Sequence, residues 1–269
     1  MTMFHPAAGS AVSQTALAPV ALTGGAIGDD NQHALPKSIA LHLLPGLGGM
    51  LALLATAPIL DAAGWPPLFA FYGPMSIAIV AVEAAYLWRQ RRARGAAGDP
   101  GPVVGFRRRL RAPVFVGLVV GLVLIGFVAT GALGVLDNIL ANSLFGGLPA
   151  WWLIRDPASM AGAPGALLGL TFVVGVVMNG LIGPIVEESY FRGHLLPRIS
   201  RLRWRAPALN AVLFSLYHFW QPWAFASRLG YVLPYTIAVH RTKSIYVGIA
   251  VHCTANLLGM LLLIGLIAR

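Results

Sequence analysis

The sequence predicts an all-α protein, a polytopic bundle of transmembrane helices, and three observations support this prediction. Of the 269 residues, 57% are hydrophobic and only 10% are charged, whereas a soluble domain carries about 25% charged residues. The mean hydropathy is +0.74. The apolar stretches are long and continuous instead of alternating, which favours membrane helices over a β-barrel.

Apolar stretches long enough to cross about 30 Å of hydrocarbon predict about seven spans, of which the fifth and sixth are short. These spans are 38–60, 67–88, 113–136, 165–194, 206–222, 224–241 and 243–268. Segment 137–163 contains a Trp pair and would add an eighth helix, re-entrant or lying at the interface. Residues 1–36 have no basic region typical of a signal peptide, so we expect a loosely ordered tail before a helical domain at 37–269.

Basic residues cluster in three connecting segments, and their positions predict the orientation of the bundle. One cluster lies between the second and third spans, a second lies at 198–205 and a third at 241–243. Counting spans places all three on one side, which the positive-inside rule makes cytoplasmic. By this count Arg155, Arg228 and Arg269 lie outside. We therefore expect a cytoplasmic N-terminus, an external C-terminus and, from the Arg/Ala/Gly-rich composition, a bacterial inner (plasma) membrane.

The formal charge of +10 follows from this topology and from attraction to anionic lipid. We expect the lipid bilayer, and no nucleic acid, as the partner of the basic clusters. The sequence leaves the oligomeric state open.

Three short motifs place polar side chains inside the last apolar stretches. They are Glu187-Glu188-x-x-x-Arg192, Phe214-x-x-x-His218 and His252-x-x-x-Asn256. Ionisable groups in hydrocarbon cost at least a few kcal/mol each and usually mark a function. At a rise of about 1.5 Å per residue, Glu187, His218 and His252 lie roughly 16, 20 and 13 Å from the nearest basic cluster. Three helices thus bring polar groups to similar depths, open to approach from the cytoplasm.

Spacing within the motifs indicates how these side chains cooperate. Residues four apart share a helix face, so Glu188 and Arg192 can form a buried ion pair while Glu187 points about 100° away. A buried Glu and a His can together remove a proton from water. A His and an Asn can donate hydrogen bonds to a developing oxyanion. This set fits hydrolysis of an amide by activated water, without a covalent nucleophile.

In this order on successive hydrophobic segments, the three motifs resemble those of the CPBP family, which comprises the type II CAAX prenyl endopeptidases and related bacteriocin-processing and immunity (Abi) proteins. The resemblance covers roughly residues 165–260, the expected catalytic core. It implies an all-helical, glutamate-dependent intramembrane protease. It also implies that Glu187 activates water together with His218, and that His252 and Asn256 form the oxyanion hole.

The resemblance further implies that Glu188 and Arg192 brace the site or contact the substrate, with Phe214 in support. We expect no cofactor and no metal. Zinc is the open alternative, because two His and a Glu could bind it and leave a free position. Against zinc, the pattern HExxH is absent and Asn is an uncommon ligand.

The leading hypothesis is an intramembrane endopeptidase that cleaves near the C-terminus of a membrane-associated or lipidated peptide or protein. A second is a non-catalytic membrane scaffold or bacteriocin self-immunity protein of the same family. A third, a transporter, has no paired inverted halves to support it. Outside the motifs, we interpret Glu83 as a structural partner or a snorkelling group and Cys253 as a small buried residue.

Overall fold

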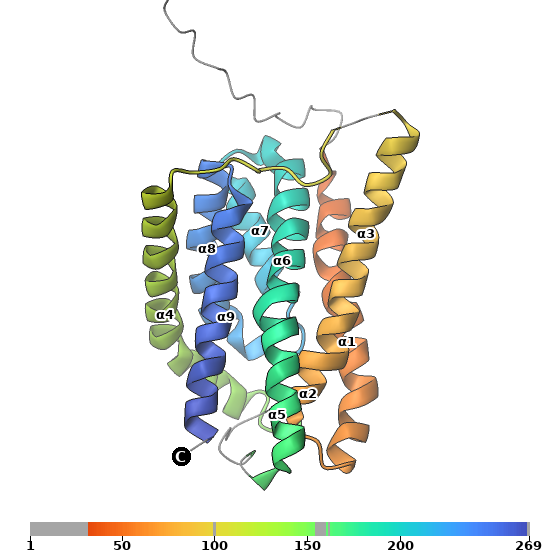
Figure 1. Ribbon diagram of the computed structural model, residues 1–269, viewed down its shortest axis with the longest axis vertical. Helices are drawn as coiled ribbons and strands as arrows, with labels where there is room; N and C mark the ends of the chain where they lie inside the picture. Colours follow the sequence, from red (N-terminus) through yellow and green to blue (C-terminus); the bar gives the residue numbers. More distant parts are fainter. Residues whose placement is uncertain (1–31, 99–100, 154–159, 161, 268–269) are drawn as a thin grey trace, which may run out of the picture.

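The computed structural model describes residues 32–98, 101–153, 160 and 162–267. These residues form an upright bundle of helices with no β-strand among them (Figure 1). The predicted all-α membrane bundle is therefore confirmed. The predicted tail at 1–36 lies almost entirely outside the described residues, and the first helix begins at Leu35.

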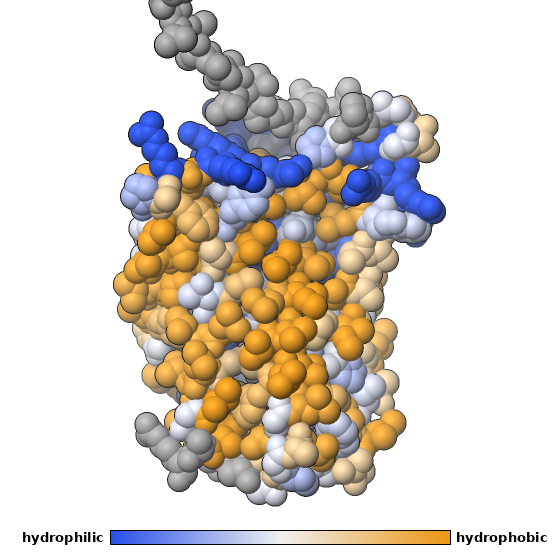
Figure 2. All heavy atoms as spheres, in the orientation of Figure 1, coloured by the Kyte–Doolittle hydropathy of each residue, from blue (hydrophilic) through white to orange (hydrophobic). Residues whose placement is uncertain are grey.

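Within the residues that the structure describes, five helical columns are long and apolar enough to cross a membrane. They are α1 (Leu35–Ala62), the column Pro67–Ala96, α4 (Ala112–Ser143), the column Gly165–Leu202 and α9 (Ile245–Ile267). Each corresponds to a predicted span. Apolar side chains face outward along the bundle, such as Val128 at 73% exposed and Leu262 at 62%, and they form the hydrophobic sides visible in Figure 2. Such a surface suits hydrocarbon as the solvent, because only there does its exposure cost nothing.

The fifth and sixth predicted spans form a hairpin, α7 (Arg205–Leu216) and α8 (Phe225–Thr242). Twelve residues of α7 reach only about 18 Å, so this helix starts at the basic end and stops inside the bundle. A turn with the short 3-10 helix η7 (Pro222–Ala224) follows. Helix α8 then returns beside α7 and packs against α4.

Two of the long columns change their helical winding along their length. The second consists of α2 (Pro67–Ala70), the π-helix η2 (Phe71–Met75) and α3 (Ser76–Ala96). The fourth consists of α5 (Gly165–Val174), π-helix η4 (Gly175–Ile182), α6 (Gly183–Glu188), π-helix η5 (Ser189–Leu195) and 3-10 helix η6 (Leu196–Leu202). Single π turns are frequent at functional sites. Here two of them flank α6, which carries the two glutamates of the first motif.

The hydrophilic residues gather at one end of the bundle, which is the upper end in Figure 2. Segment 101–111 crosses this end and is fixed by backbone bonds: Gly105 N–H donates to the carbonyl of Gly193 (2.7 Å) and Ile245 N–H to that of Phe106 (2.7 Å). On the same end, His33 N–H donates to the carbonyl of Arg198 (2.8 Å). The basic clusters thus share one end, which we call the basic end.

The segment 137–163 differs from its prediction. Helix α4 continues to Ser143, so the first part of the segment belongs to a membrane span. In the described residues that follow, 144–153, the chain forms turns instead of a re-entrant helix. Gly146, Gly147 and Pro149 explain this difference, since both residue types disfavour continued helix.

Candidate active site

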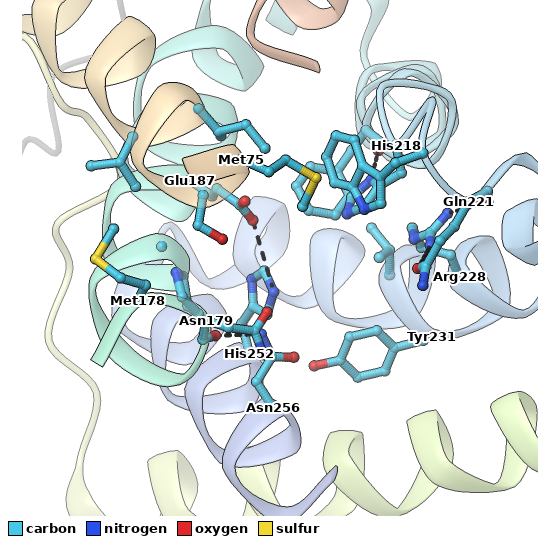
Figure 3. Close-up of a pocket in the computed structure, with 18 residues that line it drawn as sticks. Met75, Met178, Asn179, Glu187, His218, Gln221, Arg228, Tyr231, His252 and Asn256 are labelled. Atoms are coloured by element: carbon cyan, nitrogen blue, oxygen red, sulfur yellow. Dashed lines mark hydrogen bonds and ion pairs between the residues drawn. The ribbon is translucent and has the colours of Figure 1, made fainter. Parts of the chain in front are cut away.

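The three motifs meet at one cavity in the core of the bundle (Figure 3). Glu187 comes from α6, His218 from the turn after α7, and His252 and Asn256 from α9. All four line a cavity of about 230 Å³, together with Phe214. The structure thus brings together the side chains that the depth argument predicts to converge. Their catalytic roles stay predictions.

Glu188 and Arg192 form a completely buried ion pair. Arg192 Nη1 lies 3.1 Å from Glu188 Oε1, and both side chains are 0% exposed. Tyr235 donates its hydroxyl proton to the same oxygen (3.0 Å), and Arg192 Nε donates to Thr236 Oγ1 (3.3 Å). The guanidinium also stacks over Phe214 at 4.0 Å from the ring centroid, a favourable cation–π geometry. Since neither member of the pair lines the cavity, the geometry favours bracing over contact with substrate.

Helix α9 approaches Glu188 so closely that only glycine fits at position 248. A Cβ atom built on Gly248 would lie 2.5 Å from Glu188 Oε2 and 3.1 Å from Val239 Cγ2. Any larger residue would therefore push the carboxylate away from Arg192.

His252 lies between the two glutamates. Its Nδ1 is 3.1 Å from Glu188 Oε1, and its Nε2 is 3.9 Å from Glu187 Oε2. An ionised carboxylate can only accept hydrogen bonds, so Nδ1 carries a proton and donates it to Glu188. Nε2 is then the nitrogen that faces Glu187, at a distance too long for a direct hydrogen bond. The ion pair thereby fixes the orientation of the imidazole.

Glu187 has one fixed oxygen and one that faces the other motifs. Its Oε1 accepts a 2.6 Å hydrogen bond from the hydroxyl of Tyr217. Its Oε2 is the oxygen near His252. The side chain is 13% exposed, unlike that of Glu188. The neighbouring carboxylates therefore have different environments, one accessible from the cavity and one enclosed.

The tautomer of His218 follows from its backbone contact. Nδ1 lies 2.8 Å from the carbonyl oxygen of Phe214, which can only accept, so Nδ1 carries a proton and Nε2 is free. The ring is packed between Tyr217 (centroids 4.3 Å apart) and Trp220 (4.8 Å). In the described structure, no direct hydrogen bond joins His218 to Glu187, although both line the cavity.

Asn256 is held by the π-helix η4. Its Nδ2 donates to the backbone carbonyl of Asn179 (2.7 Å). A carboxamide has two N–H donors, so one remains for a ligand. Asn179 itself also lines the cavity.

An aromatic layer closes the cavity towards the basic end. Phe191, Phe214, Tyr217 and Tyr235 are each at most 1% exposed. The rings of Phe191 and Phe214 lie 4.9 Å apart, and those of Phe191 and Tyr217 lie 5.0 Å apart. Arg192 bridges Phe214 and Tyr235. The expected approach from the basic end stays a prediction, and this packing argues against it.

Three residues that line the cavity were not predicted as site residues from the sequence: Asn179, Gln221 and Arg228. Tyr217, which donates to Glu187 from beside the cavity, was not predicted either. Counting spans placed Arg228 outside, and this prediction is wrong. The count assumes that each apolar segment crosses the membrane, whereas α7 and α8 turn back inside the bundle. The only sequence signal for Tyr217 is its position directly before the motif residue His218.

Glu83 of α3 is 0% exposed, and neither of its carboxylate oxygens has a hydrogen-bond partner among the described residues. It therefore does not snorkel to the surface. Cys253 is half-buried and free. Within the described part of the chain, no group of three or more His, Cys, Asp or Glu side chains is arranged to hold a metal ion.

Comparison with known proteins gives one match. Residues 169–258 match the family model described as type II CAAX prenyl endopeptidase Rce1-like. No curated protein and no solved structure matches significantly. The matched segment contains all three motifs and the walls that they contribute to the cavity. Over residues 169–258, this integral membrane protein is therefore similar to the type II CAAX prenyl endopeptidases.

Proposed function

We propose that this protein is an intramembrane endopeptidase that hydrolyses a peptide bond near the C-terminus of a membrane-associated or lipidated peptide, using water activated by Glu187 and His218. The family match supports endopeptidase activity in general. The observation that carries the mechanism is the difference between the two glutamates, because only Glu187 reaches the cavity that His218, His252 and Asn256 line.

Glu187 is the general base of this proposal. The hydroxyl of Tyr217 holds one of its oxygens, which leaves the other to take a proton from water. The free Nε2 of His218 accepts the second hydrogen bond of the same water and orients it. The water oxygen then attacks the carbonyl carbon of the substrate, and Glu187 later gives the proton to the leaving amine.

His252 and Asn256 stabilise the oxyanion that forms in this step. The free N–H of Asn256 is one donor. The other is His252 in its doubly protonated form: Glu188 accepts from Nδ1–H, and Nε2–H then donates into the cavity. Removing one donor of this kind typically costs about 100- to 1000-fold in rate. Arg192 pairs with Glu188 and so supports His252 indirectly.

The surroundings of the site limit how substrate arrives. The aromatic layer closes the basic end, so we propose that a peptide enters from the lipid or from the opposite end of the bundle. The shared basic end supports our proposal of a cytoplasmic N-terminus and an external C-terminus. It also supports anionic lipid, and no nucleic acid, as partner, and we retain the bacterial inner membrane as the location.

Cleavage of a quenched fluorescent C-terminal peptide, with and without a farnesyl group, tests the proposed function. We expect detergent-purified wild type to cleave the peptide. In Glu187→Ala, kcat should fall by a factor of ~100 or more, the range for a general base. Asp61→Ala, a change of an exposed acidic residue at the far end of α1, is the matched control and should cleave normally.

Phenanthroline in parallel tests the metal alternative. Activity that survives the chelator supports the glutamate mechanism, and inhibition would contradict it. A Glu187→Ala variant that still cleaves would contradict the assignment of the base. A non-catalytic scaffold would instead show no cleavage by wild type and unchanged peptide binding by Glu187→Ala.

A further inference from the structure

We propose that Arg228 binds the free C-terminal carboxylate of the substrate, so that the cavity recognises the end of a peptide chain. This inference rests on the proposed endopeptidase function and names the group on the substrate that the same cavity selects. It assigns a role to a cation that none of the three motifs contains.

Arg228 lies in the first turn of α8 and lines the cavity with Glu187, His218 and His252 (Figure 3). Its guanidinium donates two hydrogen bonds, both to Gln221: Nη1 to the backbone carbonyl (3.3 Å) and Nη2 to the side-chain Oε1 (2.9 Å). A guanidinium has five N–H donors. Within the described residues, no other acceptor is bonded to it, so donors remain available for a ligand.

The charge of Arg228 has no ion-pair partner in the described part of the chain, where no carboxylate lies within 4.0 Å of its guanidinium. Glu187 and Asp137 act on it electrostatically from farther away. An unpaired cation inside a membrane protein is costly and is usually retained for a function. In contrast, Arg192 in the same bundle forms an ion pair with Glu188 at 3.1 Å. Arg192 and Arg228 therefore differ in the one property that matters for binding an anion.

Gln221 makes the site a receptor for an anion. Its Oε1 accepts from Arg228, which identifies the other end of the carboxamide as the amino group and leaves its two donors free. Gln221 also lines the cavity. Guanidinium and amide donors thus act together, and the planar fork of an arginine matches a carboxylate in a bidentate arrangement.

The position of Arg228 explains why the anion would be the end of a peptide. In Figure 3, Arg228 and Gln221 lie across the cavity from Glu187. A peptide whose scissile bond lies at Glu187 and whose carboxylate lies at Arg228 would span this space. The cavity of about 230 Å³ is smaller than a typical ligand pocket of about 300–1,000 Å³, and so suits a short terminal segment.

Two peptides that differ only in a C-terminal acid or amide test this inference. Binding is measured by fluorescence anisotropy with Glu187→Ala, and cleavage is measured with proteins that carry Glu187. We expect a preference for the acid of ~10- to 100-fold in both, the range for a hydrogen bond to a charged group. Arg228→Gln should abolish this preference, and Arg228→Lys should keep part of it.

Two control variants address purely structural roles. Asp137→Asn removes the acidic group that interacts with Arg228 from α4, and it should keep the preference if Arg228 binds substrate instead of balancing Asp137. Arg241→Gln changes an exposed arginine in the last turn of the same helix and should also keep it.

Equal binding of acid and amide peptides by Glu187→Ala would overturn the inference, whatever the folding of the Arg228 variants. An equal fall of kcat/KM for both peptides in Arg228→Gln would also overturn it, because that result indicates a structural role. Wild type that cleaves neither peptide, with the acid still preferred in binding, would refute the proposed hydrolysis and leave carboxylate recognition supported.

Discussion

The adjacent residues Glu187 and Glu188 have different side-chain environments. Glu188 is enclosed by Arg192, Tyr235 and His252, whereas Glu187 keeps one oxygen for the cavity. The motif residues and the i,i+4 ion pair were predictable from the sequence, because helix geometry alone puts Glu188 beside Arg192. The hydroxyl of Tyr217 on Glu187 was not predictable, since it depends on how α7 and α6 pack.

The ion pair gives the first prediction. Arg192→Met leaves the Glu188 carboxylate buried without its cation, so we expect a loss of unfolding free energy of about 3–5 kcal/mol. Titration with SDS, followed by tryptophan fluorescence, measures this loss. Arg205→Met, an exposed arginine at the basic end, should leave the midpoint unchanged.

The double variant Glu188→Gln with Arg192→Met sharpens this test. It removes both charges, and we expect it to recover part of the stability because no charge is left unpaired. A double variant as unstable as Arg192→Met would show that packing, and not charge, explains the loss.

Tyr217→Phe gives the second prediction. It removes only the hydroxyl that donates to Glu187, so we expect kcat to fall ~10-fold or more with KM little changed, as for a hydrogen bond to a charged group. Peptide cleavage measures both constants. Tyr190→Phe is the matched control, because that hydroxyl donates to the backbone carbonyl of Leu41. A fall in kcat as large in the control as in Tyr217→Phe would contradict the assignment.

At the scale of elements, the long helices were predictable and the interrupted ones were not. Hydropathy identifies a span by its length, so α1, α4 and α9 appear at their predicted places. The same measure cannot distinguish two crossings from a hairpin that turns back, which is why α7 and Arg228 were misplaced. The π turns beside α6 depend on contacts in the bundle, such as that of Asn179 with Asn256, and leave no periodic signal.

The start of α1 gives a prediction on pH. Burial, and then the charges of Lys37, Arg198 and Arg201, lower the pKa of His33 from 6.5 to about 4. His33 is therefore neutral when docked on η6. Once undocked or unfolded, it takes up a proton below about pH 6.5, so the docking free energy falls as the pH drops from 6.5 towards 4.

Hydrogen–deuterium exchange of the amides of residues 33 and 38, which donate to the carbonyls of Arg198 and Ala34, measures this effect. We expect faster exchange at pH 5 than at pH 7, after correction for the intrinsic rate. His33→Gln should show no such difference between the two pH values. A wild type without pH dependence would refute the role of His33.

At the scale of the whole molecule, composition alone predicted an all-helical membrane protein, because a chain with 10% charged residues cannot cover itself with polar surface. The common basic end was predictable as well. Counting the α7–α8 hairpin as two spans does not change the side on which the following segment lies. A hairpin returns the chain to the side from which it started, and two full crossings do the same.

This arrangement predicts the orientation that labelling can test. In a chain with Cys253→Ala, we expect Asp61→Cys to react with a membrane-impermeant maleimide in spheroplasts, and Arg203→Cys to react only after lysis. Both positions are exposed and lie at opposite ends of the bundle. The reverse pattern would invert the proposed topology.

The short hairpin also has a consequence for biogenesis. Neither α7 nor α8 is both long and apolar enough to count as a membrane span, and α8 contains Arg228, so a lipid bilayer would not accept this pair as an independent segment. The hairpin can enter the membrane only against neighbours that are already inserted, among them α4 and α9. The cavity at the three motifs is therefore completed last, after α9 has left the ribosome, so under the proposed function a nascent chain cannot cleave peptides while it is being synthesised.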